Sequence, residues 1–76
     1  MEKPATKEFM SGISNTEGCV KYTPQSATVN NVKGYIWTKR VLMDSNWVHK
    51  GQQHVRSGAH EVEVTAAFDS DEEGSY

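Results

Sequence analysis

From Cys19 onward, polar and apolar residues alternate with a period of two rather than 3.6. Alternation of this kind is typical of β-strands, because successive side chains of a strand point to opposite faces of a sheet. The clearest examples are residues 35–43 and residues 60–68. Turn-forming residues interrupt the pattern too often for the long crossovers that parallel strands need. The chain is therefore predicted to be mostly β, with four to five short strands in a small antiparallel sheet or an open barrel.

The expected strands are bounded by residues that turn or break a strand. Proline cannot donate a hydrogen bond to a neighbouring strand, so Pro24 is expected to end the first strand. Lys33-Gly34 and Asp44-Ser45-Asn46 are expected turns, and Gly51 is expected to break a further strand. The candidate strands are residues 19–23, 27–32, 35–43, 47–50, 52–56 and 60–68, of which residues 52–56 are the weakest.

The two ends of the chain lack this alternation. Residues 1–18 are rich in Ser, Thr, Gly, Asn and charged residues, and they are predicted to be an irregular N-terminal segment. Residues 69–76 are acidic and have no apolar periodicity, so they are predicted to be a disordered tail. Between them, residues 19–68 are predicted to form a single small β domain.

Alternation also predicts which side chains share a face of the sheet. Within residues 35–43, Tyr35, Trp37 and Lys39 fall on one face, while Arg40 falls on the other. Within residues 60–68, the acidic side chains fall on a solvated face. The side chains expected on the opposite, half-buried face are His60, Val62, Val64, Ala66 and Phe68.

The length of the chain limits what it can be. A chain of 76 residues and 8.5 kDa suits one small domain with a thin margin of stability. Cys19 is the only cysteine, so no disulfide can form within the chain and a reducing compartment is the simpler location. No stretch approaches the about 20 apolar residues that cross a bilayer, and no signal peptide is evident. We expect a protein of the cytoplasm, of a host cell or of an assembled particle, without membrane contact.

The charge of the chain is unevenly distributed. The formal net charge is −2, but residues 32–60 carry five bases against one acid, and residues 61–76 carry six acids and no base. Such segregation in so short a chain calls for an explanation. The acidic end has three interpretations: a solvated terminus, a segment that folds back on the basic stretch, or a docking element for a basic partner.

Metal binding and catalysis find little support in the sequence. His49, His54 and His60 lie close in sequence, with Cys19 and Glu61 as further donors, but there is no second cysteine to complete a paired set of zinc ligands. Nothing around Cys19 marks a nucleophile beside a base, and the glycines are too scattered for a phosphate-binding loop. We therefore expect no metal, no other cofactor and no enzymatic activity.

Aromatic and basic residues interleave between residues 33 and 56. A strand surface of this composition can stack bases and contact phosphates, as small β modules that bind single strands do. Against this, the tryptophans of so small a domain are expected in the core. The net charge is also acidic, whereas nucleic-acid binding predicts a basic footprint.

The leading interpretation is a non-catalytic protein-binding module that acts by occupying a partner's surface, as accessory and inhibitor proteins do, including those encoded by viruses and phages. The alternatives are a module that binds single-stranded nucleic acid or RNA, and a structural subunit that self-associates in a larger assembly. The residues expected to bind the partner are the aromatic and basic residues of the 33–56 stretch and two acidic residues that follow it: Tyr35, Trp37, Lys39, Arg40, Trp47, Lys50, Arg56, Glu61 and Glu63.

Overall fold

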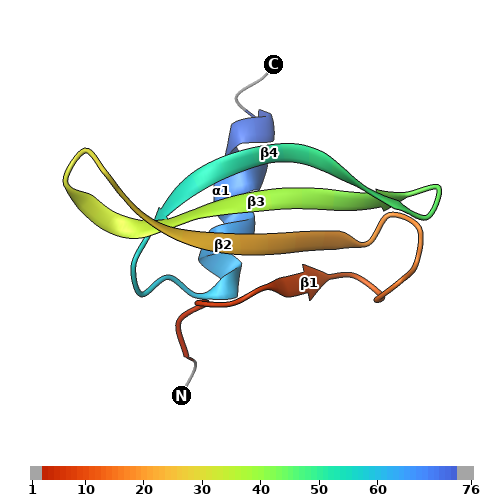
Figure 1. Ribbon diagram of the computed structural model, residues 1–76, viewed down its shortest axis with the longest axis horizontal. Coiled ribbons are helices and arrows are strands. Elements are labelled where there is room, and N and C mark those ends of the chain that lie inside the picture. Colours follow the sequence, from red (N-terminus) through yellow and green to blue (C-terminus); the bar gives the residue numbers. More distant parts are fainter. Residues whose placement is uncertain (1–2, 74–76) are drawn as a thin grey trace.

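The computed structural model describes residues 3–73 of the chain, and the side chains of residues 3–69. Within this part the elements are β1 (Phe9–Ser11), β2 (Val20–Val29), β3 (Val32–Met43), β4 (Asn46–Arg56) and α1 (Glu61–Glu73). The strands form one antiparallel sheet in the order β1-β2-β3-β4, and α1 runs across one of its faces (Figure 1). The predicted mostly β fold with a small antiparallel sheet is confirmed, and the sheet is open.

Two-residue turns join β2 to β3 and β3 to β4. Asn30 and Asn31 have φ angles of 51° and 65°, and Asp44 and Ser45 have φ angles of 51° and 66°. Positive φ at both central residues defines the type I′ turn, whose twist matches that of the flanking strands. Asn and Asp tolerate this conformation better than most residues. The turn expected at Asp44-Ser45-Asn46 is confirmed at Asp44 and Ser45, and Asn46 already begins β4. The turn expected at Lys33-Gly34 is wrong, because the two asparagines turn the chain earlier.

Pro24 does not end β2, contrary to the prediction. β1 pairs only with residues 20–22 of β2, so Pro24 lies where β2 has no strand on its outer side. Val29 and Val32 flank the turn and exchange hydrogen bonds, and hydrogen-bonded pairs alternate along an antiparallel ladder. This alternation places Pro24 in a non-hydrogen-bonded pair with Trp37. Its nitrogen therefore faces the open edge, where the missing N–H removes no ladder hydrogen bond.

Gly51 marks a β-bulge rather than a break in β4. Lys39 pairs with Gly51 but Arg40 pairs with His49, so Lys50 is an extra residue on the β4 side. The φ of Gly51 is 155°, a value that glycine adopts more readily than other residues. The two segments expected as separate strands on either side of Gly51 therefore form one continuous strand.

The core lies between the sheet and α1. Its buried side chains come from β2, β3 and β4 on one side and from α1 on the other, with Ala5 from the N-terminal segment and Ala59 from the segment between β4 and α1. Phe9 packs against Tyr22 and Trp37, with ring centroids 5.0 and 5.4 Å apart. The buried members of the core are Ala5, Tyr22, Trp37, Val55, Ala59, Val64 and Phe68.

The strand predicted for residues 60–68 is wrong, because these residues belong to α1. Val64 and Phe68 are both buried, and their separation of four residues satisfies a helical period as well as a period of two. Val62 and Ala66 distinguish the two patterns, since both are exposed, with Val62 at 73%. Alternation over so few apolar residues therefore could not separate a strand from an amphipathic helix.

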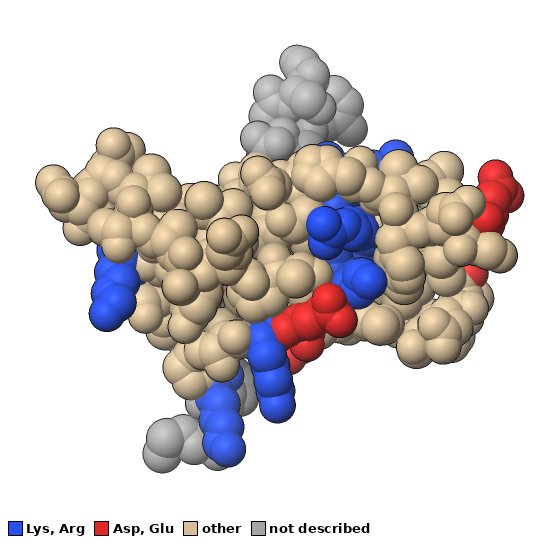
Figure 2. Space-filling model, in the orientation of Figure 1, with Lys and Arg blue, Asp and Glu red and all other residues tan. Residues whose placement is uncertain are grey.

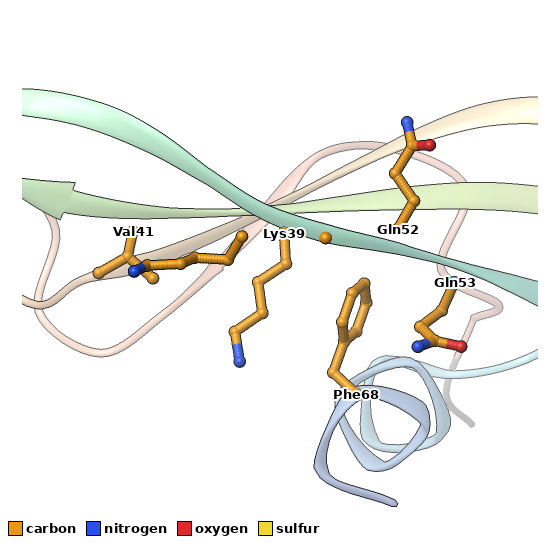
Figure 3. A pocket seen from close by; sticks show the side chains of 7 residues that line it. Lys39, Val41, Gln52, Gln53 and Phe68 are labelled. Carbon is orange, nitrogen blue, oxygen red and sulfur yellow. The ribbon is translucent and has the colours of Figure 1, made fainter. Parts of the chain in front are cut away.

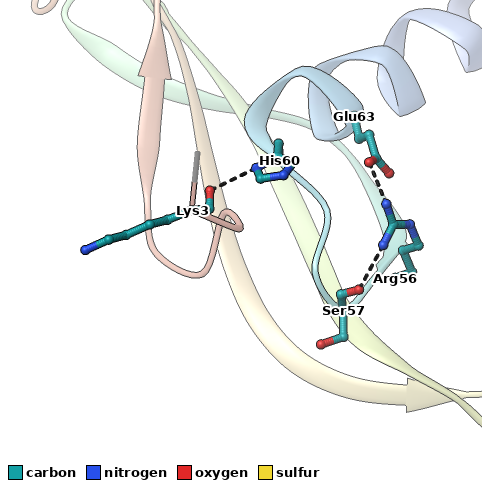
Figure 4. Close-up of polar contacts among 5 residues, drawn as sticks. All are labelled: Lys3, Arg56, Ser57, His60 and Glu63. Atoms are coloured by element: carbon teal, nitrogen blue, oxygen red, sulfur yellow. Dashed lines mark hydrogen bonds and ion pairs between the residues drawn. The ribbon is translucent and has the colours of Figure 1, made fainter. Parts of the chain in front are cut away.

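The N-terminal segment is anchored beside the start of α1. The N–H of Ala5 donates to the carbonyl oxygen of Ala59 at 2.7 Å, and Nδ1 of His60 donates to the carbonyl oxygen of Lys3 at 3.0 Å (Figure 4). Apart from the short β1, residues 3–18 are irregular, as predicted. At the other end, α1 includes residues 69–73 of the predicted acidic tail, and residues 74–76 lie outside the described part of the chain.

The helical assignment makes two neighbouring valines respond differently to truncation. Val64→Ala truncates a fully buried side chain by two methyl groups and is expected to lower the free energy of unfolding by about 2 kcal/mol. Val62→Ala changes an exposed side chain and is expected to alter it by less than about 0.5 kcal/mol. Urea denaturation followed by circular dichroism measures both. Equal losses would favour a strand that buries both valines.

Candidate binding surface

The face of the sheet opposite α1 is the candidate site. In Figure 2, which shows the molecule from this side, a group of Lys and Arg atoms lies to the right of the centre, with Asp or Glu atoms beside it. Side chains are assigned to this face by their alternation along the paired strands. One contact on this face joins β4 to β3: the Nε2 of Gln52 donates a hydrogen bond to the hydroxyl of Thr38 at 3.1 Å. We call this surface the open face; its main residues are Lys21, Thr23, Ile36, Thr38, Arg40, Leu42, Trp47, His49, Gln52 and His54.

The bulge in β4 brings Trp47 and His49 to the open face. Beyond the bulge, the odd-numbered residue Val55 lies on the helix-covered face, where it is buried in the core. Before the bulge the phase is reversed, so Trp47 lies opposite Leu42 and His49 lies opposite Arg40. A bulge commonly re-aims side chains in this way. Trp47 is therefore partly exposed on the open face. The expectation that the tryptophans of so small a domain lie in the core is wrong for Trp47.

Two cations and one indole form the centre of the open face. Lys21 and Arg40 are directly opposite each other on β2 and β3, and the Nζ of Lys21 lies 4.4 Å from the centre of the Trp47 ring. The indole stabilises the lysine by a cation–π interaction. Like charges directly opposite in a sheet are destabilising. Among the described side chains neither Lys21 nor Arg40 forms an ion pair, and the carboxylate of Glu8 on the same face instead accepts a hydrogen bond from the hydroxyl of Thr23 at 3.0 Å.

One end of the open face is closed by the loop between β1 and β2. The backbone of this loop pairs with Leu42, which is buried with Cys19 beneath it. The carboxylate of Glu17 accepts hydrogen bonds from the N–H of Asp44 at 3.2 and 3.3 Å, which ties the loop to the turn between β3 and β4. The remaining open face extends from Trp47 toward His54 without a covering segment in the described part of the chain.

The structure separates the predicted binding residues between different surfaces. Tyr35 and Trp37 share the helix-covered face, as predicted, and Trp37 is only 1% exposed, so it serves the core. Lys39 lies on the same side, with its Nζ 5.8 Å from the centre of the Phe68 ring. Lys50 is the bulge residue. Of the predicted residues, the open face holds Arg40 and Trp47.

The remaining predicted residues lie near the start of α1. Arg56 and Glu63 form an ion pair at 2.6 Å, and Arg56 also donates to the carbonyl oxygen of Ser57 at 3.3 Å (Figure 4). Both charged side chains are exposed, so their pairing contributes little to stability. Glu61 is exposed at the first position of α1, where a negative charge is favourable near the helix N-terminus.

Lys21 is the basic residue at the centre of the open face that sequence reasoning missed. It lies outside the basic and aromatic stretch of residues 33–56, within the short first strand candidate. The signal that would have found it is the Asn30-Asn31 turn. In a hairpin with a two-residue turn, paired positions are equidistant from the turn, and this places Lys21 opposite Arg40.

Neither a metal cluster nor a membrane-spanning helix appears in the part of the chain that the structure describes. Within these residues no three His, Cys, Asp or Glu side chains are placed to hold a metal ion. The same residues include no helix long and apolar enough to cross a bilayer. Comparisons with protein-family models, with curated proteins and with solved structures found no match. A proposal for function therefore depends on the geometry of this chain.

The two tryptophans are expected to report the two faces of the sheet separately. In a Trp37→Phe variant the remaining Trp47 emission should be strongly quenched by acrylamide, because Trp47 is partly exposed. In a Trp47→Phe variant the Trp37 emission should be quenched weakly, because Trp37 is buried. When Lys21→Met is added to each of these variants, the emission should change in the variant that retains Trp47 and stay the same in the variant that retains Trp37. Similar quenching of both tryptophans would contradict the assignment of faces.

Proposed function

We propose that this protein is a non-catalytic binding module that contacts another protein through the open face of its sheet. The observation that carries the proposal is the pair of opposed cations, Lys21 and Arg40, beside the indole of Trp47. Placing two bases opposite each other lowers stability, and neither base forms an ion pair with a described acidic side chain. A partner that supplies carboxylates would convert this repulsion into attraction.

The composition of the open face supports a protein partner. Tryptophan and arginine are the residues most often found at the energetic centre of protein interfaces. Here Arg40 and Trp47 are accompanied by Ile36, which is partly buried, and by neutral polar side chains along β2, β3 and β4. A mixed surface of this kind suits a partner with acidic groups around an apolar patch. The charge of the centre would favour encounter with such a partner.

A second candidate, binding of single-stranded nucleic acid, is favoured by one contact. Lys21 lies over the ring of Trp47, and an indole beside cations can stack a base while the cations contact its phosphates. The other aromatic residues of the basic stretch do not support it, because Trp37 is buried and Tyr35 packs against the core. Only Trp47 offers a stacking surface among the aromatic residues of β3 and β4.

Reversal of the two central charges tests the proposal. Lys21→Glu with Arg40→Glu changes the open face, and Lys7→Glu with Lys33→Glu is the matched control, because it changes the net charge equally at exposed positions outside the open face. Proteins retained by the wild type from nuclease-treated extract are purified, and their affinities are measured by isothermal titration calorimetry. We expect the open-face variant to bind at least about tenfold more weakly, a loss of about 1.4 kcal/mol, and the control to bind like the wild type.

The outcomes separate the two candidates. An unchanged Kd for the open-face variant, with both variants folded by circular dichroism, would refute binding through this face. If retention disappears with nuclease, a labelled single-stranded oligonucleotide is titrated at several salt concentrations. Affinity that falls steeply with salt and is lost in the open-face variant would replace protein binding with nucleic-acid binding as the function of the same surface.

A further inference from the structure

Three basic side chains form a single row across the open face. Lys21 of β2 pairs with Arg40 of β3, and Arg40 pairs in turn with His49 of β4. The row therefore crosses the strands, with one base on each of them. Neighbouring strands of a sheet lie about 4.8 Å apart, so the three positions span about 10 Å. We call these three side chains the basic row.

The basic row is separate from the lysines on the helix-covered side of the sheet. Lys39 and Lys50 line a pocket there beside Phe68, between β3, β4 and α1. Figure 3 shows Lys39 and Phe68 on one side of the strands and the side chain of Gln52 on the other. Gln52 belongs to the open face. The bases at the centre of that face are therefore the three of the basic row.

The basic row has an aromatic neighbour on one side and polar neighbours on the other. Trp47 lies in the adjacent row toward the turn between β3 and β4, opposite the buried Leu42. On the other side, Thr38 and Gln52 are joined by a hydrogen bond of 3.1 Å. Along β3 each adjacent row is two residues from Arg40, a distance of about 7 Å. An elongated partner about 10 Å wide that follows the basic row would contact both neighbours.

The spacing of the basic row matches that of side chains on one face of a helix. Residues i, i+4 and i+7 of a helix share a face, and a rise of about 1.5 Å per residue makes them span about 10.5 Å. In an extended chain, three side chains on one face span about 13 Å, which is longer than the row. A helix can also lie across these strands, since α1 does so on the opposite face of the same sheet (Figure 1).

His49 makes the charge of the basic row depend on pH. Histidine is the side chain whose charge ordinarily changes between pH 5 and 8, and His49 is exposed. The row has three positive charges when this imidazole is protonated and two when it is neutral. The carboxylates of Glu8 and Glu17 accept hydrogen bonds elsewhere, from Thr23 and from the N–H of Asp44. The charged residues that adjoin this part of the open face are Lys21, Arg40, Glu8, Glu17, Asp44 and, next in β4, Lys50.

We propose that the open face binds an acidic helix of the partner protein, which lies across the strands and places carboxylates at positions i, i+4 and i+7 on Lys21, Arg40 and His49. This inference rests on the proposed function, because it names the partner chemistry of the same surface. Protonation of His49 adds a third cation for the carboxylates and strengthens the contact. Trp47 packs beside the helix. Affinity for the partner therefore increases as the pH falls from 8 to 6.

Two helical peptides of the same composition test the spacing. Each has about 20 residues, enough for an alanine-rich sequence to form a helix, and circular dichroism confirms equal helicity. One carries glutamates at i, i+4 and i+7, and the other carries them at i, i+5 and i+6, which point to three sides of a helix. Affinity for the full chain is measured by fluorescence anisotropy of a dye on each peptide.

We expect the peptide with glutamates on one face to bind at least about fivefold more tightly than the other. Lys21→Glu with Arg40→Glu should remove this difference, because the carboxylates then meet like charges. Equal affinity of the two peptides for the wild type, or no binding of either, would overturn the proposal.

Variants of His49 test its contribution at constant ionic strength. The wild type should bind the one-face peptide about threefold more tightly at pH 6 than at pH 8, a range in which glutamate stays ionised. His49→Gln should bind equally at both pH values, and His49→Lys should bind tightly at both. His54→Gln is the matched control, because His54 lies on the same face and strand but opposite Ile36, outside the row. PH dependence that persists in His49→Gln would overturn the role of His49.

Failure of this inference is distinguishable from failure of the proposed function. If Lys21→Glu with Arg40→Glu weakens binding of the protein retained from extract while both peptides bind the wild type alike, the surface is correct and its helical ligand is wrong. If the same variant leaves the Kd of that protein unchanged, the proposed function fails, and the basic row fails with it as the binding site.

Discussion

The packing of Val64 and Phe68 against the aromatic side chains of the sheet is the contact on which the rest of the structure depends. One helix can cover one face of the sheet, and burial of these two side chains determines which face that is. Burial of apolar surface is the main favourable term in folding, and it requires two layers. The described chain has no second helix, so the other face is covered only at the end where the loop between β1 and β2 buries Leu42. The polar and basic composition of the open face is the consequence, with Lys21 and Arg40 at positions that a second layer would require to be apolar.

The sheet was largely predictable from the sequence because its signals are local. Alternation over residues 35–43 correctly placed Tyr35 and Trp37 on one face, and the turn at Asp44-Ser45 has the chemistry of a hairpin. The errors arose where a local signal has two meanings. Proline is excluded from a paired strand but is tolerated at an open edge, and whether Pro24 has a neighbour depends on where the distant β1 pairs. Val64 and Phe68 fit both a strand and a helix, and the exposure of Val62 and Ala66 decides between them.

The candidate surface was less predictable than the fold, because it depends on pairing between strands. Alternation distributes the side chains of a basic and aromatic stretch over the two faces of a sheet. Here some of them lie on the helix-covered face, in or beside the core, and the others lie on the open face. Arg40 and Trp47 reach the same surface from different strands. Lys21 lies beside them because of the register of the β2–β3 hairpin. That register cannot be inferred from the composition of either strand alone. Knowing the type of the Asn30-Asn31 turn would have supplied that register.

The bulge at Lys50 determines which side chains of β4 reach each face of the sheet. Without it, regular alternation from Val55 would carry Trp47 and His49 to the helix-covered side, and the open face would lose its only aromatic residue from β4. The same extra residue adds Lys50 to the pocket beside Phe68. Gly51 allows the bulge to form with little backbone strain, because a φ of 155° is more accessible to glycine than to residues with a side chain. A glycine that appears in the sequence as a strand breaker is therefore the feature that assigns the charged and aromatic side chains of β4 to their faces.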